Sequence, residues 1–155
     1  MLNQLAKLGL ESEGRYATTA ELQFLKYYMT TLDQRISAYE KIRDAEFQIM
    51  AAATAQARAS NPAIFMRGEQ DLTSMAQRDC SLVLRCAAAA LLIDDLDRLR
   101  DSLLLWHQTI IKAVKTDHIS QAMWKVLPDV VKQYLSPEEA TIVMPVLQLN
   151  QALLR

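Results

Sequence analysis

Apolar residues recur every three or four positions along almost the whole chain, while glycine and proline are scarce. This spacing is typical of amphipathic α-helices, which pack one face against the rest of the protein. A clear example lies between residues 18 and 40, where the recurring apolar positions are Leu22, Leu25, Met29, Leu32, Ile36 and Tyr39. The pattern therefore predicts an all-α protein.

Capping and breaking signals divide this pattern into separate helices. Thr18 and Glu21 have the spacing of a capping box, which predicts that a helix starts there. The helical composition then continues far beyond the length of one globular helix, so we expect two helices that meet at residues 43–47. The second of them is expected to end at Asn61, because Pro62 pushes the preceding residue out of the helical region.

Two more helices are predicted in the middle of the chain. Asp71 is placed to cap a helix that continues to the acidic residues at 94–97, where we expect a bend. Thr116 or Asp117 is expected to cap the next helix. Pro128 is expected to interrupt that helix, because proline lacks a backbone donor and clashes with the preceding turn.

The last helix is predicted over residues 137–154. Ser136 is its expected cap, Pro137 suits its first turn, and the two glutamates that follow favour its positive end. Pro145 is expected to kink it. Six to eight helices with short connections and no repeat favour a globin-like array over a four-helix bundle, which remains the alternative.

A short amphipathic segment precedes this array. Leu2, Leu5 and Leu8 share one stripe, which a small domain cannot easily bury within itself. The segment is therefore expected either to dock on another chain or to fold back on the body. We interpret the chain as a single domain over residues 1–155, with a docking helix and turn at 1–17 and a globin core at 18–155.

Length and charge limit the partners of this domain. The chain has 155 residues, 51% of them hydrophobic, which is enough to form one core. Its 17 lysines and arginines nearly balance 18 acidic residues, so we expect no binding to nucleic acid. No apolar stretch in the sequence is long enough for a transmembrane segment, and we expect a cytoplasmic location.

The sequence contains no common catalytic motif, such as CxxC, HExxH, GxSxG, GxGxxG or a P-loop, and we expect no enzyme activity. Its only two cysteines, Cys80 and Cys86, lie in the stretch QRDCSLVLRC. A helix separates them by a rise of about 9 Å, which is beyond the reach of a disulfide. Both are expected to be reduced thiols.

Cys80 lies on an apolar face of its predicted helix. At about 100° per residue, the positions that align with it are Ala76, Leu84, Ala87 and Leu91. A lone cysteine on such a face is most often an inert, buried side chain. For Cys86 we keep that interpretation, and for Cys80 the alternative is a binding site.

Charged and small residues on the same helix leave two interpretations open. Arg78 and Arg85 share another face, where two guanidinium groups could meet the two carboxylates of a ligand. Without such a ligand they would form a solvated face. Asp79 lies on a third face with Cys86. The alanines at 87–90 would let either another helix or a flat ligand approach closely.

Several stretches resemble the subunits of phycobiliproteins. ESEGRYATTAEL at residues 11–22 is similar to the opening of their first globin helix, and YLSPEEATIV at residues 134–143 is similar to the opening of their last. Asn61 and Pro62 fall at the family's helix stop, and Cys80 falls where the family attaches a linear tetrapyrrole. The resemblance implies a globin-like fold with N-terminal helices that pair subunits as a homodimer or heterodimer.

The resemblance weakens after the cysteine. Light-harvesting members have the pattern Cys-x-Arg-Asp-x-Asp, in which the first Asp accepts hydrogen bonds from pyrrole nitrogens and the Arg pairs with a propionate. The corresponding residues here are Leu82 and Val83. The chain is therefore identified as a divergent member, similar to the bilin-binding globins associated with bilin biosynthesis rather than to antenna subunits.

The resemblance implies a bilin, either phycocyanobilin or another linear tetrapyrrole derived from biliverdin, joined to Cys80 by a thioether. Two arginines would hold its propionates, and Asp79 could replace the missing acid if the pigment lay differently. The candidate bilin-contacting residues are Cys80, Arg78, Asp79, Arg85, Leu84 and Arg67. A bilin lyase or bilin-biosynthesis enzymes would be partners, and a phycobilisome component would associate with the thylakoid.

Two alternative functions remain open. Loss of the family's Arg and Asp favours a structural or regulatory subunit that kept the scaffold and the pairing helices without a pigment. His107 favours a haem-binding sensor, because globin folds bind iron through a helix histidine. Trp106 and Trp124 are expected to belong to the core, although either could stack on a pyrrole ring.

Overall fold

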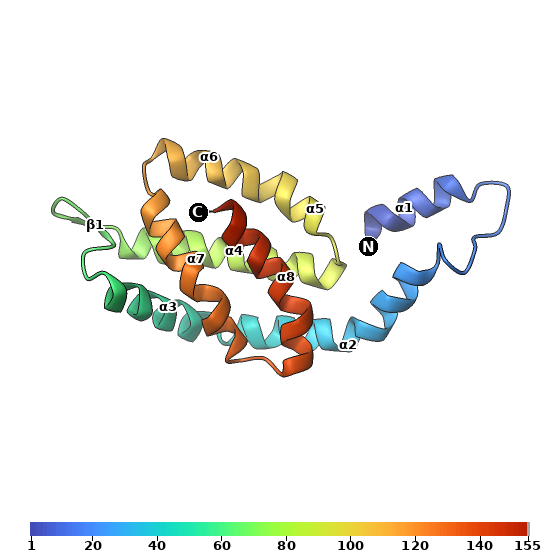
Figure 1. The fold of residues 1–155 in the computed structure, drawn as a ribbon, viewed down its shortest axis with the longest axis horizontal. Helices are drawn as coiled ribbons and strands as arrows, with labels where there is room; N and C mark the ends of the chain where they lie inside the picture. Colours follow the sequence, from blue (N-terminus) through green and yellow to red (C-terminus); the bar gives the residue numbers. More distant parts are fainter. Residues whose placement is uncertain (155) are drawn as a thin grey trace.

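The computed structural model describes residues 1–154, which form helices and one short hairpin (Figure 1). The all-α, globin-like prediction is confirmed. In chain order the elements are α1 (Leu2–Glu11), α2 (Gln23–Asp44), α3 (Glu46–Ser60), β1 (Met66–Arg67), β2 (Gln70–Asp71), α4 (Thr73–Ile93), α5 (Leu96–Leu99), the π-helical segment η1 (Arg100–Leu104), α6 (Leu105–Ala113), α7 (Asp117–Lys132) and α8 (Pro137–Leu153).

Helix α4 forms the centre of the body. Figure 1 shows it between the continuous α5–η1–α6 segment on one side and the α2–α3 pair on the other, with α7 and α8 crossing in front. It is buried along much of its length, at Ala76, Cys80, Val83, Leu84, Ala87, Ala88, Ala90 and Leu91. Two stripes of this helix therefore pack against different neighbours.

Local signals place most helix ends correctly. Helices α2 and α3 meet at Ala45, inside the predicted interval, and α3 ends at Ser60, directly before Asn61. Ser136 and Glu139 form the full capping box at the start of α8, with the Glu139 backbone nitrogen 3.2 Å from Ser136 Oγ. These predictions are confirmed because each depends on neighbouring residues in the sequence.

Two predicted boundaries are wrong. The Thr18 and Glu21 capping bonds do form, with 2.7 Å between the Thr18 nitrogen and Glu21 Oε2, but α2 begins only at Gln23. Pro128 does not interrupt α7, which passes through it without a break. The proline is buried, so packing against the core compensates for the lost backbone hydrogen bond.

Helix α1 and the first turns of α2 form an arm that extends away from the body (Figure 1). No residue of α1 is buried, and Leu10 exposes 76% of its surface. The arm is hydrogen-bonded to the body at the end of α4: the Met1 amino group donates to the Asp94 carbonyl oxygen, and Asn3 Nδ2 lies 3.4 Å from Asp95 Oδ1. The alternative in which this segment folds back on the core is therefore not observed.

Candidate functional site on helix α4

The Cys80 thiol is sealed inside the body. Its exposed fraction is 5%, and every residue predicted to share its face is buried as well, which confirms the apolar face. Burial raises the pKa of Cys80 to about 12, and the negative charge of Asp79 acts in the same direction. The group is therefore a protonated thiol at neutral pH, whereas thioether formation requires an accessible thiolate.

A small cavity lies beside Cys80, between α4, α6 and α7. Its volume is about 20 Å³, and its walls include Asp79, His107, Ser120 and Trp124. Pockets for ligands of drug size measure roughly 300–1,000 Å³. The space beside Cys80 therefore holds no more than a water molecule in this conformation, and a tetrapyrrole needs α6 or α7 to move.

His107 and the two tryptophans occupy different environments. His107 is buried against this cavity, and desolvation lowers its pKa although the charge of Asp79 opposes the shift. Trp124 is 1% exposed and belongs to the core as predicted. The same prediction is wrong for Trp106, which is 58% exposed, because α6 buries only His107 and Ile111 and turns its other face to solvent.

The structure does not bring Arg78 and Arg85 together to face one ligand. Arg78 Nη2 lies 2.9 Å from Oδ1 of its neighbour Asp79. Arg85 instead reaches α3, where its Nη2 and Nε lie 2.6 Å and 2.7 Å from the two carboxylate oxygens of Glu46. This bidentate pair lowers the pKa of Glu46.

Arg67 is also engaged elsewhere. It lies in β1, and its Nη2 donates to the backbone oxygen of Val114 at 2.6 Å, beyond the end of α6. The positive charge is favourable there because helix ends carry unsatisfied carbonyl groups. Arg67 therefore connects the hairpin to α6, and its guanidinium is already occupied.

A larger groove opens further along α4, under α5 and η1, beside two of the alanines at 87–90 that the sequence offered to a flat ligand or another helix. Its volume is about 340 Å³, and its lining includes Cys86, Ala89, Ala90, Arg98, Ser102 and Leu103. Cys86 is half-buried and is a free thiol, as predicted. The spacing of Cys86, Ala89, Ala90 and Ile93 along one stripe could be read from the sequence. The sequence could not show that no other helix within residues 1–154 covers this stripe.

Arg98 stands at the edge of this groove with its guanidinium unengaged. Within residues 1–154, every other arginine side chain forms an ion pair or donates a hydrogen bond, whereas for Arg98 the described residues provide neither. Only its backbone nitrogen is bonded, at 3.1 Å from Oδ1 of the buried Asp95. Arg98 is therefore available to an anionic ligand.

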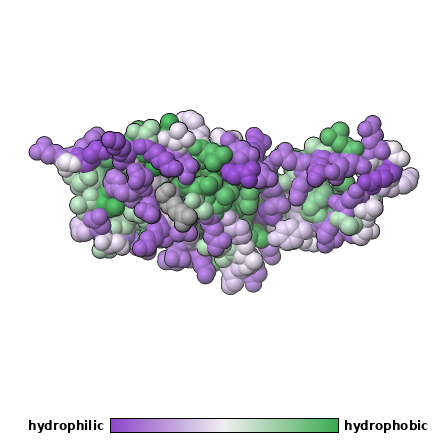
Figure 2. Space-filling model, turned by 45° about the horizontal axis from the view of Figure 1, so that its top comes forward, coloured by the Kyte–Doolittle hydropathy of each residue, from purple (hydrophilic) through white to green (hydrophobic). Residues whose placement is uncertain are grey.

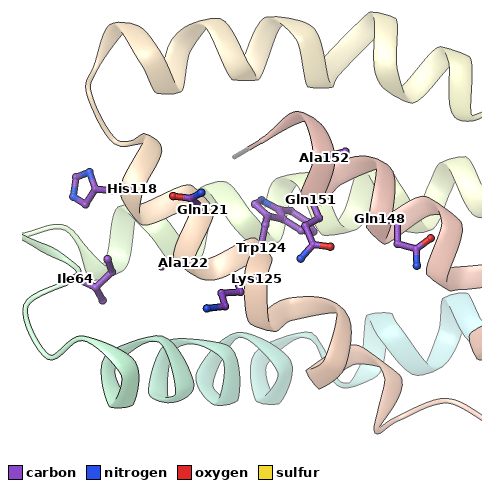
Figure 3. Close-up of a pocket in the computed structure, with 9 residues that line it drawn as sticks. All are labelled: Ile64, His118, Gln121, Ala122, Trp124, Lys125, Gln148, Gln151 and Ala152. Atoms are coloured by element: carbon purple, nitrogen blue, oxygen red, sulfur yellow. The ribbon is translucent and has the colours of Figure 1, made fainter.

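A further hollow lies on another face, between α7, α8 and the start of the hairpin. It measures about 800 Å³ and is open and polar, and Figure 3 shows Gln121 and Lys125 on α7 opposite Gln148 and Gln151 on α8. Trp124 lines both this hollow and the Cys80 cavity. It therefore forms the wall that separates the thiol from this face of the protein.

The fold defines a globin-like all-α protein with hollows on both sides of its central helix. A family model described as phycobilisome protein matches residues 8–153, and the chain belongs to that family. The resemblance drawn from the sequence is thereby confirmed. No curated protein matches the chain. None of the helices in residues 1–154 has both the length and the apolar composition needed to span a membrane.

Proposed function

We propose that this member of the phycobilisome family binds a bilin between α4 and the α5–η1–α6 segment. The pigment would be phycocyanobilin or another biliverdin-derived linear tetrapyrrole, which is flat, largely apolar and carries two carboxylates. The supporting observation is the groove of about 340 Å³ that α4 forms with α5 and η1, while the space between α4 and α6 measures only about 20 Å³. The larger volume falls within the range of ligand pockets.

Displacement of α6 would expose few buried side chains of that helix. Only His107 and Ile111 are buried among the nine residues of α6, and exposing an isoleucine costs about 1.5–3 kcal/mol. Each 100 Å² of apolar pigment surface removed from water contributes about 2.5 kcal/mol. A few hundred square ångströms of pigment would therefore outweigh the displacement. The π-helical η1 precedes α6, and such segments are frequent at functional sites.

An alternative alignment of the family pattern supports a pigment near Asp79. The motif Cys-x-Arg-Asp also fits one helical turn earlier, where the chain has Ala76, Gln77, Arg78 and Asp79. The family's arginine and acid are then retained, and alanine replaces the thiol. Ala76, Asp79 and Cys80 line the same small cavity. In this alignment Asp79 would accept hydrogen bonds from the pyrrole nitrogens, and the thioether would have to come from another cysteine.

A second candidate function is a subunit that pairs with another chain and carries no pigment. The sealed thiol of Cys80 favours it, and so does the arm. Figure 2 shows apolar side chains in green on that arm, which includes the exposed Tyr27 and Met29 of α2. Pairing through this surface with a second chain of the same family, as a homodimer or a heterodimer, is compatible with both functions. The proposed location remains the cytoplasm or the cytoplasmic face of the thylakoid.

Co-production of the chain with a haem oxygenase and a bilin reductase separates these functions. We expect the purified protein to absorb visible light with the spectrum of a protein-bound bilin. A colourless dimer would contradict pigment binding and favour the scaffold function. A Soret band would favour the haem alternative. Only His107 supports that alternative, and the cavity beside it, of about 20 Å³, is too small for haem.

A further inference from the structure

We propose that Cys86, rather than Cys80, is the thiol that anchors the bilin, and that Arg98 binds one of its propionates. This inference rests on the proposed function, since it assigns the attachment point of the same pigment. It departs from the position that the family resemblance indicates. It also assigns a role to the groove under α5 and η1.

The two thiols differ in access. A carbon atom of the pigment must reach the sulfur before a bond can form. Cys80 is 5% exposed beside about 20 Å³ of space, whereas Cys86 is half-buried in the wall of a groove of about 340 Å³. Burial also raises the pKa of Cys80 to about 12, which keeps it protonated. Only Cys86 therefore meets the pigment without a rearrangement of the core.

The residues that line the groove suit a flat ring system with polar edges. Ala89 and Ala90 remove bulk from the surface of α4, so a planar ring can lie close to the helix. Leu99 and Leu103 supply apolar contacts from the opposite side. The buried carboxylate of Asp95 lies at the same end, as an acceptor for pyrrole N–H groups.

Arg98 provides the charge complementarity. Its guanidinium has no acidic partner in residues 1–154, so it can bind a carboxylate in a bidentate manner without breaking an existing pair. Arg78 and Arg85 would first have to release Asp79 at 2.9 Å and Glu46 at 2.6 Å. Among the arginines of α4 and α5, Arg98 is therefore the best placed for a propionate.

The attachment itself is an addition that balances without a co-reactant. The Cys86 sulfur forms a bond to one carbon of an exocyclic double bond of the bilin, and the π bond of that double bond is consumed. The thiol proton is transferred to the neighbouring carbon. No group leaves and no oxidant is required, so the pigment and the protein are sufficient.

Single cysteine variants of the full chain, co-produced with a haem oxygenase and a bilin reductase, test the assignment. We expect Cys80→Ala to keep a coloured band on a denaturing gel, and Cys86→Ala to lose that band while the native protein still absorbs as a bilin complex. Colour retained in Cys86→Ala and lost in Cys80→Ala would overturn the assignment. If Cys86→Ala does not fold, Cys86→Ser replaces it in this test. Circular dichroism compares the helix content of each variant with that of the wild type.

The Arg98→Gln variant tests the second half of the inference, with Arg100→Gln as the matched control. Arg100 already pairs with Asp97 and Asp101, so its loss should leave pigment binding unchanged. Loss of Arg98 should weaken non-covalent retention of the bilin by about tenfold or more, as expected for a charge-assisted hydrogen bond. Equal effects of the two variants would overturn the role of Arg98. Absence of bilin absorbance in the wild-type protein would instead reject the proposed function itself.

Discussion

The two halves of α4 carry chemically identical thiols in opposite surroundings. Around Cys80 the covering helices α6 and α7 place His107, Ile119 and Trp124 against α4 and leave about 20 Å³. Around Cys86 the covering segment is the short α5 and the π-helical η1, which leave about 340 Å³. The difference shows that access to a thiol on this helix depends on what packs over it and not on the residue type.

The largest expected effect comes from removing the wall of the closed end. Trp124→Ala should lower the free energy of unfolding by about 3–5 kcal/mol, because Trp124 is 1% exposed and its loss leaves a cavity. Urea denaturation of this variant and of Trp106→Ala measures the difference. Trp106 is 58% exposed, so its substitution should stay within about 0.5 kcal/mol. Similar losses in both variants would mean that the Cys80 end is not closed as described.

The open end depends on a polar network instead. Buried Arg35 on α2 donates from Nη1 to the Leu91 carbonyl oxygen at 2.7 Å, and its Nη2 lies 3.0 Å from Asp94 Oδ1. Arg35→Ala leaves these acceptors unpaired and should destabilise the protein by about 3 kcal/mol. Hydrogen exchange should show the loss concentrated at residues 91–95. An equal loss of protection around Cys80 would contradict the view that the Arg35 network stabilises only the part of α4 near Leu91.

Alkaline pH should destabilise the protein through the buried Cys80 thiol. The pKa of Cys80 is raised from 9.0 to about 12 by burial, so its contribution to stability is complete below pH 9 and is lost as the pH rises toward 12. At pH 10 the free energy of unfolding should fall by about 1 kcal/mol through this group. Denaturation of Cys80→Ala over the same pH range should show a smaller fall. Identical curves for the wild type and Cys80→Ala would contradict the raised pKa of Cys80.

The smallest expected effect concerns Arg85. Glu46→Gln removes its partner, but the Arg85 side chain is mostly exposed, so the stability loss should be below about 1 kcal/mol. Pigment binding should not change, because Arg85 faces α3 and not the groove. Absorbance titration with a bilin gives the affinity. Tighter binding in this variant would indicate that the released Arg85 binds a propionate of the bilin, as the sequence suggested.

The sequence was sufficient for features that depend on neighbouring residues. The capping box at Ser136, the helix end before Pro62 and the apolar face of Cys80 follow from local spacing, and all three are confirmed. The pairing of Arg85 with Glu46 joins positions 39 residues apart, and no local pattern contains it. Tolerance of Pro128 inside α7 likewise depends on burial against the core.

The open groove could not be predicted for the same reason. Cys86 and the alanines at 89 and 90 form a visible stripe of small residues, but small residues on a helix face accommodate another helix as readily as a ligand. The outcome depends on how α5 and η1 follow the bend after Asp94, whose φ of 50° lies in the left-handed region. The geometry of this bend determines the volume of the groove beside Cys86.

Mass spectrometry of tryptic peptides from the pigmented wild-type protein tests the central claim most directly. Cleavage after Arg78, Arg85 and Arg98 places Cys80 in the peptide 79–85 and Cys86 in the peptide 86–98. We predict that the bilin mass is found on residues 86–98 and that residues 79–85 are recovered unmodified. Bilin mass on residues 79–85, with 86–98 unmodified, would contradict the account.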